Sequence, residues 1–111
     1  AERVIKRAVK VDDEPLTVDD IMDKVCGHFN VTTAQVNSRS RKQDYVQARQ
    51  VSMYLAQKYT KMPASRIGKL VGNRDHSTVI HSCAQVTKRL QVDPLFTEEL
   101  TTIENSFKLK N

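Results

Sequence analysis

Residues 72–83 read GNRDHSTVIHSC, and this stretch decides the fold. Gly72-Asn73 is a plausible left-handed stop for a preceding helix, because glycine and asparagine tolerate positive φ. Asp75 lies where the next helix begins, and Pro63 is well placed to start a shorter helix before the turn. The sequence therefore predicts a short helix, a tight turn and a longer helix over residues 63–91. This is the layout of a helix-turn-helix, whose second helix enters the DNA major groove.

The longer helix, expected from about Asp75 to about Gln91, has two unlike faces. One arc is apolar and predicts a buried stripe, while the opposite arc carries hydrogen-bonding and basic groups without an acid. An acid-free arc suits a surface close to phosphates, although a solvated face of an ordinary helical hairpin is the alternative interpretation. The apolar arc consists of Val79, Cys83, Val86 and Leu90. The polar arc consists of Ser77, Thr78, His81, Gln85 and Lys88.

Small and polar residues at the start of this helix can read DNA. Asp75 can cap the helix, which is the simpler interpretation, or accept from a cytosine amino group. His76 can contact a thymine methyl group, and Ser77 lets the helix approach base edges closely. Thr78 has a hydroxyl free for a phosphate oxygen, and His81 can donate to another.

Helical periodicity extends through the rest of the chain, with no internal repeat and no β-hairpin signature. We expect an all-α domain of about six helices, preceded by a linker helix. Thr17 and Asp20 have the spacing of a capping box. The apolar face of the short helix is expected to consist of Ile67, Leu70 and Val71. The other expected elements are a basic helix over 2–11, a helix from Thr17 to Asn30, a short turn capped by Thr32 or Thr33, a helix starting at Asp44 with Ala48, Val51, Leu55 and Tyr59 inward, and a last helix from about Thr97.

The positive charge is concentrated in the middle of the chain. The 111 residues carry a formal net charge of +5, which suits a single domain with a polyanionic partner. Residues 37–90 hold 11 basic residues against Asp44 and Asp75, a balance of +9, whereas 1–36 and 91–111 each sum to −2. No apolar run approaches the length of a membrane span, and two cysteines do not make a disulfide scaffold. We therefore expect a cytoplasmic protein.

The run at 72–83 closely resembles the signature G-G-R-D-H-T-T-V-L-H-A-C of the C-terminal DNA-binding domain family of DnaA, the bacterial chromosomal replication initiators. The basic stretch at 38–42 and the helix that follows it also fit the family pattern. The resemblance covers about residues 16–110. It implies a helix-turn-helix DNA-binding domain over 16–111, with residues 1–15 as a linker helix and the end of a preceding ATPase lid.

The resemblance implies sequence-specific binding of double-stranded DNA at DnaA boxes, about TTATCCACA, at the replication origin, for initiation of replication. It implies no cofactor in this chain, with ATP in the full-length family protein, and possible regulatory proteins as partners. An isolated domain of this kind is expected to be a monomer that does not bind membranes, and the resemblance implies association with the nucleoid. Base contacts are implied for Arg41 in the minor groove and for Asp75, His76 and Ser77 in the major groove. Phosphate contacts are implied for Arg49, Gln50, Arg74, Thr78, His81 and the main chain near Ala64 and Ser65.

Other functions are less well supported by the residues. The phosphate-loop pattern G-x-x-x-x-G-K-[ST] is absent, so we expect no ATP hydrolysis and no enzymatic activity in this chain. His76, His81 and Cys83 do not share a helix side, and no further cysteine pair completes a zinc site. The remaining alternative is a helical protein-interaction module whose basic face meets an acidic partner. Two departures from the family signature, Asn73 for glycine and Ser77 for threonine, bear on the turn and on base preference respectively.

Overall fold

The computed structural model describes residues 16–109 of the chain. The described part contains helices and no strand, which confirms the all-α prediction. The predicted helix over 2–11 and the proposed linker at 1–15 lie outside the described residues. The helices are α2 (Val18–Phe29), α3 (Thr33–Asn37), α4 (Gln43–Thr60), α5 (Ala64–Leu70), α6 (His76–Val92) and α7 (Pro94–Leu109).

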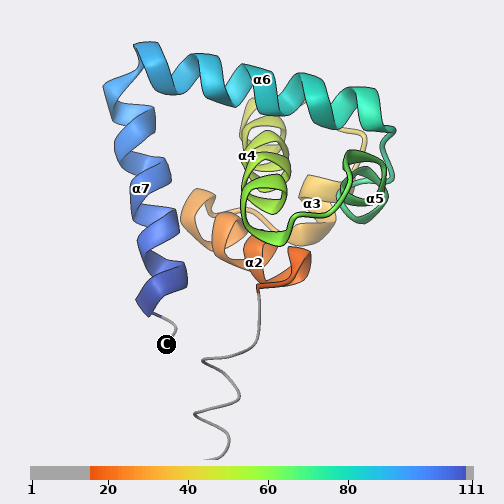
Figure 1. Cartoon of the computed structure of the whole chain (residues 1–111), viewed down its shortest axis with the longest axis horizontal. Coiled ribbons are helices and arrows are strands. Elements are labelled where there is room, and N and C mark those ends of the chain that lie inside the picture. Colours follow the sequence, from red (N-terminus) through yellow and green to blue (C-terminus); the bar gives the residue numbers. More distant parts are fainter. Residues whose placement is uncertain (1–15, 110–111) are drawn as a thin grey trace, which may run out of the picture.

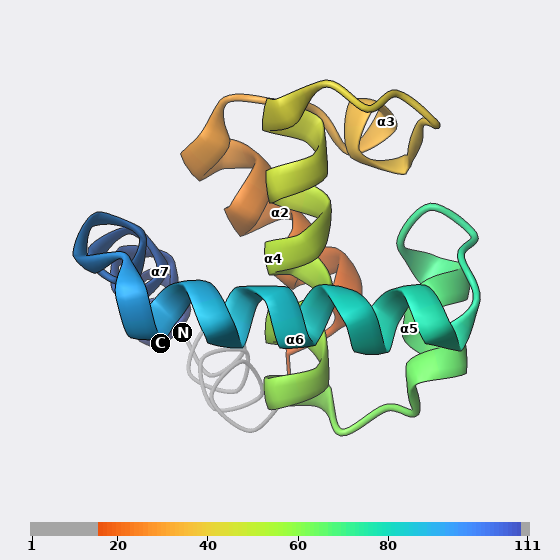
Figure 2. The same ribbon diagram turned by 90° about the horizontal axis from the view of Figure 1, so that it is seen from above.

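Helix α4 lies at the centre of the domain, with α2 on one side and α6 crossing it on the other (Figure 1). Seen from above, α3 and α5 lie towards the end at which α6 begins, and α7 lies at the end at which α6 stops (Figure 2). Because α4 has a helix on each side, it is buried on more than the single stripe that its sequence indicates. Ala48, Val51 and Leu55 are buried as predicted, Tyr59 is half-buried, and Ser52, Met53 and Ala56 are buried as well.

Side-chain caps fix the first two helices. Thr17 and Asp20 form the predicted capping box, with the Asp20 amide donating to Thr17 Oγ1 at 3.1 Å and the Thr17 amide donating to Asp20 Oδ2 at 3.3 Å. A second capping box joins Thr32 and Gln35 through bonds of 2.9 and 3.1 Å. Asn30 ends α2 in the left-handed conformation, at φ 60°. These local bonds satisfy amides that a helix start leaves unpaired.

Three boundary or core predictions need correction. Helix α4 begins one residue earlier than predicted, at Gln43. Helix α7 begins at Pro94 rather than Thr97, because Asp93 Oδ1 accepts from the Phe96 amide at 3.1 Å and proline suits a first helical position. Leu70 is 43% exposed, since the narrow buried face of α5 is centred on Ile67 and Gly68 and Leu70 lies at its edge.

Helix α6 has the two faces that its sequence predicts. Val79, Cys83 and Val86 are buried and Leu90 is half-buried, which confirms the apolar stripe. On the opposite arc Ser77, His81, Gln85 and Lys88 are exposed and Thr78 is half-buried. The polar arc is therefore free to meet a partner along most of its length.

The turn before α6 depends on glycine at two positions. Gly72 and Asn73 have φ of 82° and 54°, which confirms the predicted left-handed turn. Gly68 allows α5 to pack directly on the backbone of this turn, where the Arg74 amide donates to the Gly68 carbonyl at 2.7 Å. A Cβ at position 68 would overlap the Arg74 carbonyl oxygen and lie 2.9 Å from its carbon. The start of α6 is thus fixed by a backbone-to-backbone contact.

Replacing Gly68 by alanine should lower the free energy of unfolding by about 1–3 kcal/mol, because backbone atoms must move apart to admit the methyl group. Gly27→Ala is the matched control, since a Cβ there meets nothing within 4 Å. That substitution, at an exposed position of α2, should raise the free energy of unfolding by about 0.4–1 kcal/mol. Urea denaturation followed by circular dichroism measures both. Equal stability of the two variants would contradict the proposed contact.

Candidate nucleic-acid interface

Asp75 caps α6 with one of its two carboxylate oxygens. Oδ1 accepts from both the backbone amide and the hydroxyl of Thr78, each at 3.0 Å. These two hydrogen bonds lower the pKa of Asp75 below its ordinary value. Within the described residues Oδ2 receives no hydrogen bond, and the side chain is exposed. Capping and acceptance from a base are therefore compatible at the same moment.

The residues that follow Asp75 differ in their exposure and in their hydrogen bonds within the protein. His76 and Ser77 are exposed in the first turn of α6, and His81 is exposed one turn later. The Thr78 hydroxyl donates to Asp75, so the expectation of a free hydroxyl is wrong for this structure. Its oxygen can still accept a hydrogen bond, but donation to a phosphate requires Thr78 to release Asp75.

The basic loop, residues 38–42, connects α3 to α4 and is ordered by its own serines. Ser38 Oγ donates to the Gln35 carbonyl at 2.6 Å and accepts from the Ser40 amide at 3.3 Å. Ser40 Oγ accepts from the Lys42 amide at 3.2 Å. Such hydroxyl-to-amide bonds form turns that replace backbone pairing. Arg39 and Arg41 are exposed, so the loop presents its charges outward.

The buried side chain of Arg49 donates hydrogen bonds to the backbone of this loop and of α3. The side chain is only 7% exposed, and its Nε donates to the Val36 carbonyl at 2.8 Å. One terminal nitrogen donates to the carbonyls of Ser38 at 2.9 Å and Ser40 at 3.2 Å. Burial, and then the charge of Arg74, lower the pKa of Arg49. The predicted phosphate contact of Arg49 stays a prediction, whereas its contacts with the loop carbonyls were not foreseen.

Arg74 joins the basic loop to the turn before α6. Its terminal nitrogen donates to the Ser38 carbonyl at 2.9 Å, across 36 positions of sequence. A Cβ at Gly72 would lie 3.7 Å from Asn37 Cα, so the two backbones are close at this point. The start of the basic loop and the turn before α6 therefore lie side by side.

The other predicted phosphate contacts are more widely spread. Gln50 is half-buried on α4 and lines a groove that Gln85 and Lys88 of α6 also line, so it extends the polar arc. Ala64 and Ser65 lie in the first turn of α5, where backbone amides have no partner within the helix. That turn is at the opposite end of α5 from the turn at Gly72.

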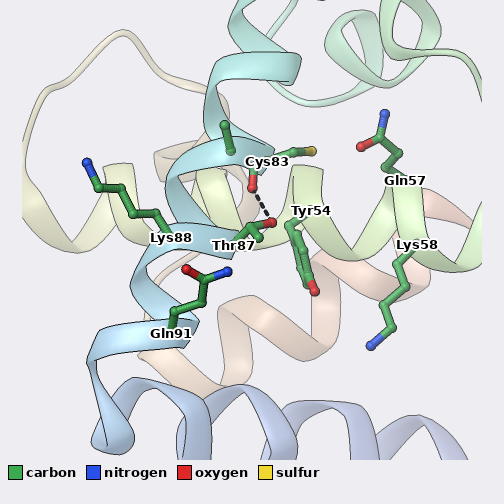
Figure 3. A pocket seen from close by; sticks show the side chains of 8 residues that line it. Tyr54, Gln57, Lys58, Cys83, Thr87, Lys88 and Gln91 are labelled. Atoms are coloured by element: carbon green, nitrogen blue, oxygen red, sulfur yellow. Dashed lines mark hydrogen bonds between the residues drawn. The ribbon is translucent and has the colours of Figure 1, made fainter.

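A hollow between α4 and α6 is lined by residues of both helices, among them Tyr54, Lys58, Cys83 and Thr87 (Figure 3). Lys58 Nζ pairs with Glu104 at 2.8 Å, and the Thr87 hydroxyl donates to the Cys83 carbonyl at 2.9 Å. Burial raises the pKa of the Cys83 thiol, so it is protonated at neutral pH and is a poor nucleophile. Among residues 16–109 no three His, Cys, Asp or Glu side chains gather in a way that could hold a metal ion. No described helix is long and apolar enough to cross a membrane.

Comparison with known proteins identifies relatives. A family model described as the bacterial dnaA protein helix-turn-helix matches residues 18–86, more than half of the chain. The chromosomal replication initiator protein DnaA of Bacteroides fragilis is 41% identical over 111 residues, which is 100% of this chain and 23% of that protein. The protein of the same name from Bacteroides thetaiotaomicron is 42% identical over 110 residues, 99% of this chain and 23% of that protein. The chain thus spans less than a quarter of the length of these relatives.

The cap at Asp75 predicts a pH dependence of stability. Because hydrogen bonds lower its pKa in the folded protein, the stabilisation is complete above the unfolded value of about 3.9 and is lost as pH falls through the folded pKa. Asp75→Asn keeps a capping oxygen without titrating. The difference in unfolding free energy between wild type and Asp75→Asn should therefore be constant from about pH 7 to 5 and shrink towards about pH 3. Urea denaturation at each pH measures it, and a constant difference would contradict the cap.

Proposed function

The chain belongs to the bacterial DnaA helix-turn-helix family, and we propose that it binds double-stranded DNA at DnaA boxes, close to TTATCCACA. In this proposal α6 enters the major groove and the basic loop enters the adjacent minor groove. The observation that supports it is the Arg74 bond to Ser38, which keeps the loop bearing Arg41 beside the exposed start of α6. One rigid surface can then contact two neighbouring grooves.

The exposure of each residue at this surface indicates the part of the DNA that it could contact. Asp75 Oδ2, His76 and Ser77 are proposed to contact bases, and Arg41 to enter the minor groove. Backbone phosphates would hold the register, because they fix position without carrying sequence information. The proposed phosphate contacts are Gln50, Arg74, Thr78, His81 and the main chain at Ala64 and Ser65, with Arg49 retained from the family resemblance.

The relatives are named chromosomal replication initiator proteins, so we propose that the boxes lie at a replication origin and that binding there serves initiation. The chain corresponds to the helix-turn-helix part of these relatives, not to their ATPase region. We expect DNA binding by this chain to need no nucleotide or metal. The alternative partner, an acidic protein on the same basic face, is distinguished by sequence preference, because salt weakens both complexes.

The proposal is tested by titrating fluorescently labelled duplexes, one with the box and one scrambled, at a fixed salt concentration. Wild type should prefer the box, and His76→Ala should lose about 1–3 kcal/mol of that preference, because the variant lacks a contact with a base edge. His28→Ala is the matched control, since His28 is exposed on α2 and faces Glu99 of α7, not the start of α6. Equal affinity of wild type for both duplexes would overturn sequence-specific binding.

Arg41→Ala should weaken box binding about tenfold when the flanking minor groove is narrow and A·T-rich, since a narrow groove has the negative potential that attracts arginine. With a G·C-rich flank the loss should be smaller. Arg39→Ala removes the same charge from the same loop and should weaken both duplexes alike. A loss for Arg41→Ala that is independent of the flank would show that Arg41 contacts only phosphate.

A further inference from the structure

Two arginines from different elements meet at one backbone oxygen. Arg49 from α4 and Arg74 from the turn before α6 each place a terminal nitrogen 2.9 Å from the Ser38 carbonyl oxygen. A carbonyl oxygen has two lone pairs and can accept both bonds. This oxygen is therefore the point at which the basic loop is attached to the central helix and to the helix-turn-helix.

The charge of Arg49 is satisfied by carbonyl groups and not by an acid. Burying a charged group is costly unless it is hydrogen-bonded, and Arg49 makes its bonds to Val36, Ser38 and Ser40. The ion pairs of the described residues involve His28, Lys58 and Arg89, and so neither arginine at Ser38. The two guanidinium groups share one acceptor, so their like charges repel each other. Hydrogen bonds to the loop carbonyls hold both groups in place despite this repulsion.

The contact with Ser40 bears directly on Arg41. The Ser40 carbonyl and the Arg41 amide belong to one rigid peptide plane. Arg49 holds that carbonyl at 3.2 Å, while the exposed Arg41 side chain extends from the next Cα. The plane that carries Arg41 is thus oriented by a buried residue that lies eight positions later in the chain.

We propose that Arg49 and Arg74 are positioning residues, which hold the basic loop in a fixed relation to α6 so that both grooves are contacted as one unit. This inference rests on the proposed function for its DNA readout, but the restraint on the loop belongs to the free protein. This role is separate from the phosphate contacts proposed above, because a phosphate contact of Arg49 or Arg74 alone would act independently of Arg41.

The DNA test is a double-mutant cycle between these arginines and Arg41. Arg49→Lys keeps the charge but loses the planar fork that reaches three carbonyls, and Arg74→Lys keeps the charge but loses the guanidinium group that bonds Ser38. Each should weaken binding to an A·T-flanked box roughly tenfold and abolish the flank preference, as Arg41→Ala does. In the Arg41→Ala background each should cost almost nothing further, because the group they position is gone. Arg66→Lys, an exposed arginine of α5, is the matched control.

The free protein supplies a readout that needs no DNA. In both lysine variants the backbone amides of residues 39–42 should show lower NMR order parameters and faster hydrogen exchange, with the α6 amides unchanged. Should Arg49→Lys fail to fold, Arg74→Lys decides the question, because Arg74 is only partly buried.

The outcomes distinguish failure of the positioning role from failure of the proposed function. Additive losses with Arg41→Ala, or a retained flank preference, would show independent phosphate contacts and overturn the positioning role. Unchanged loop order in the free variants would overturn it as well. Equal binding of wild type to box and scrambled duplexes would refute the proposed function instead, and the loop measurements would then decide the positioning role alone.

Discussion

The interface depends on the close packing of Gly68 against the backbone of Arg74. Because no side chain separates them, the Arg74 amide reaches the Gly68 carbonyl at 2.7 Å and the turn is held against α5. This contact sets where α6 begins, with Asp75 as its cap. It also sets where the Arg74 side chain begins its path to Ser38. One backbone contact thus fixes both the helix start and the position of the basic loop.

The positive charge of the middle segment has two uses. Arg39 and Arg41 are exposed and provide the electrostatic attraction that a polyanion requires. Arg49, Arg74 and Arg89 are instead hydrogen-bonded within the fold, with Arg89 donating to Gln47 at 2.8 Å. The count of basic residues therefore overstates the free charge of the surface. In the proposed complex, the bonded arginines would contribute order and the exposed ones affinity.

Local sequence signals predicted most elements, because each depends on neighbouring residues. The Thr17 capping box, the left-handed turn at Gly72 and the buried stripe of α6 follow from residues one to four positions apart. The error at Leu70 arose where distant packing decides the outcome, whereas the error at the start of α7 concerns a local cap. Leu70 is exposed because α5 buries only a narrow face against α6. Helix α7 begins early because Asp93 caps it while also ending α6.

The sequence by itself determined the helical class, the position of the helix-turn-helix, the acid-free face of α6 and, through the resemblance of residues 72–83, the family. Only the tertiary structure decided that Arg49 is buried beneath the basic loop and meets Arg74 at the Ser38 carbonyl. No spacing rule reveals this, since the bonds join side chains to backbone oxygens 9 to 36 positions away. Such partners exist only once three helices have packed and brought those carbonyls within reach.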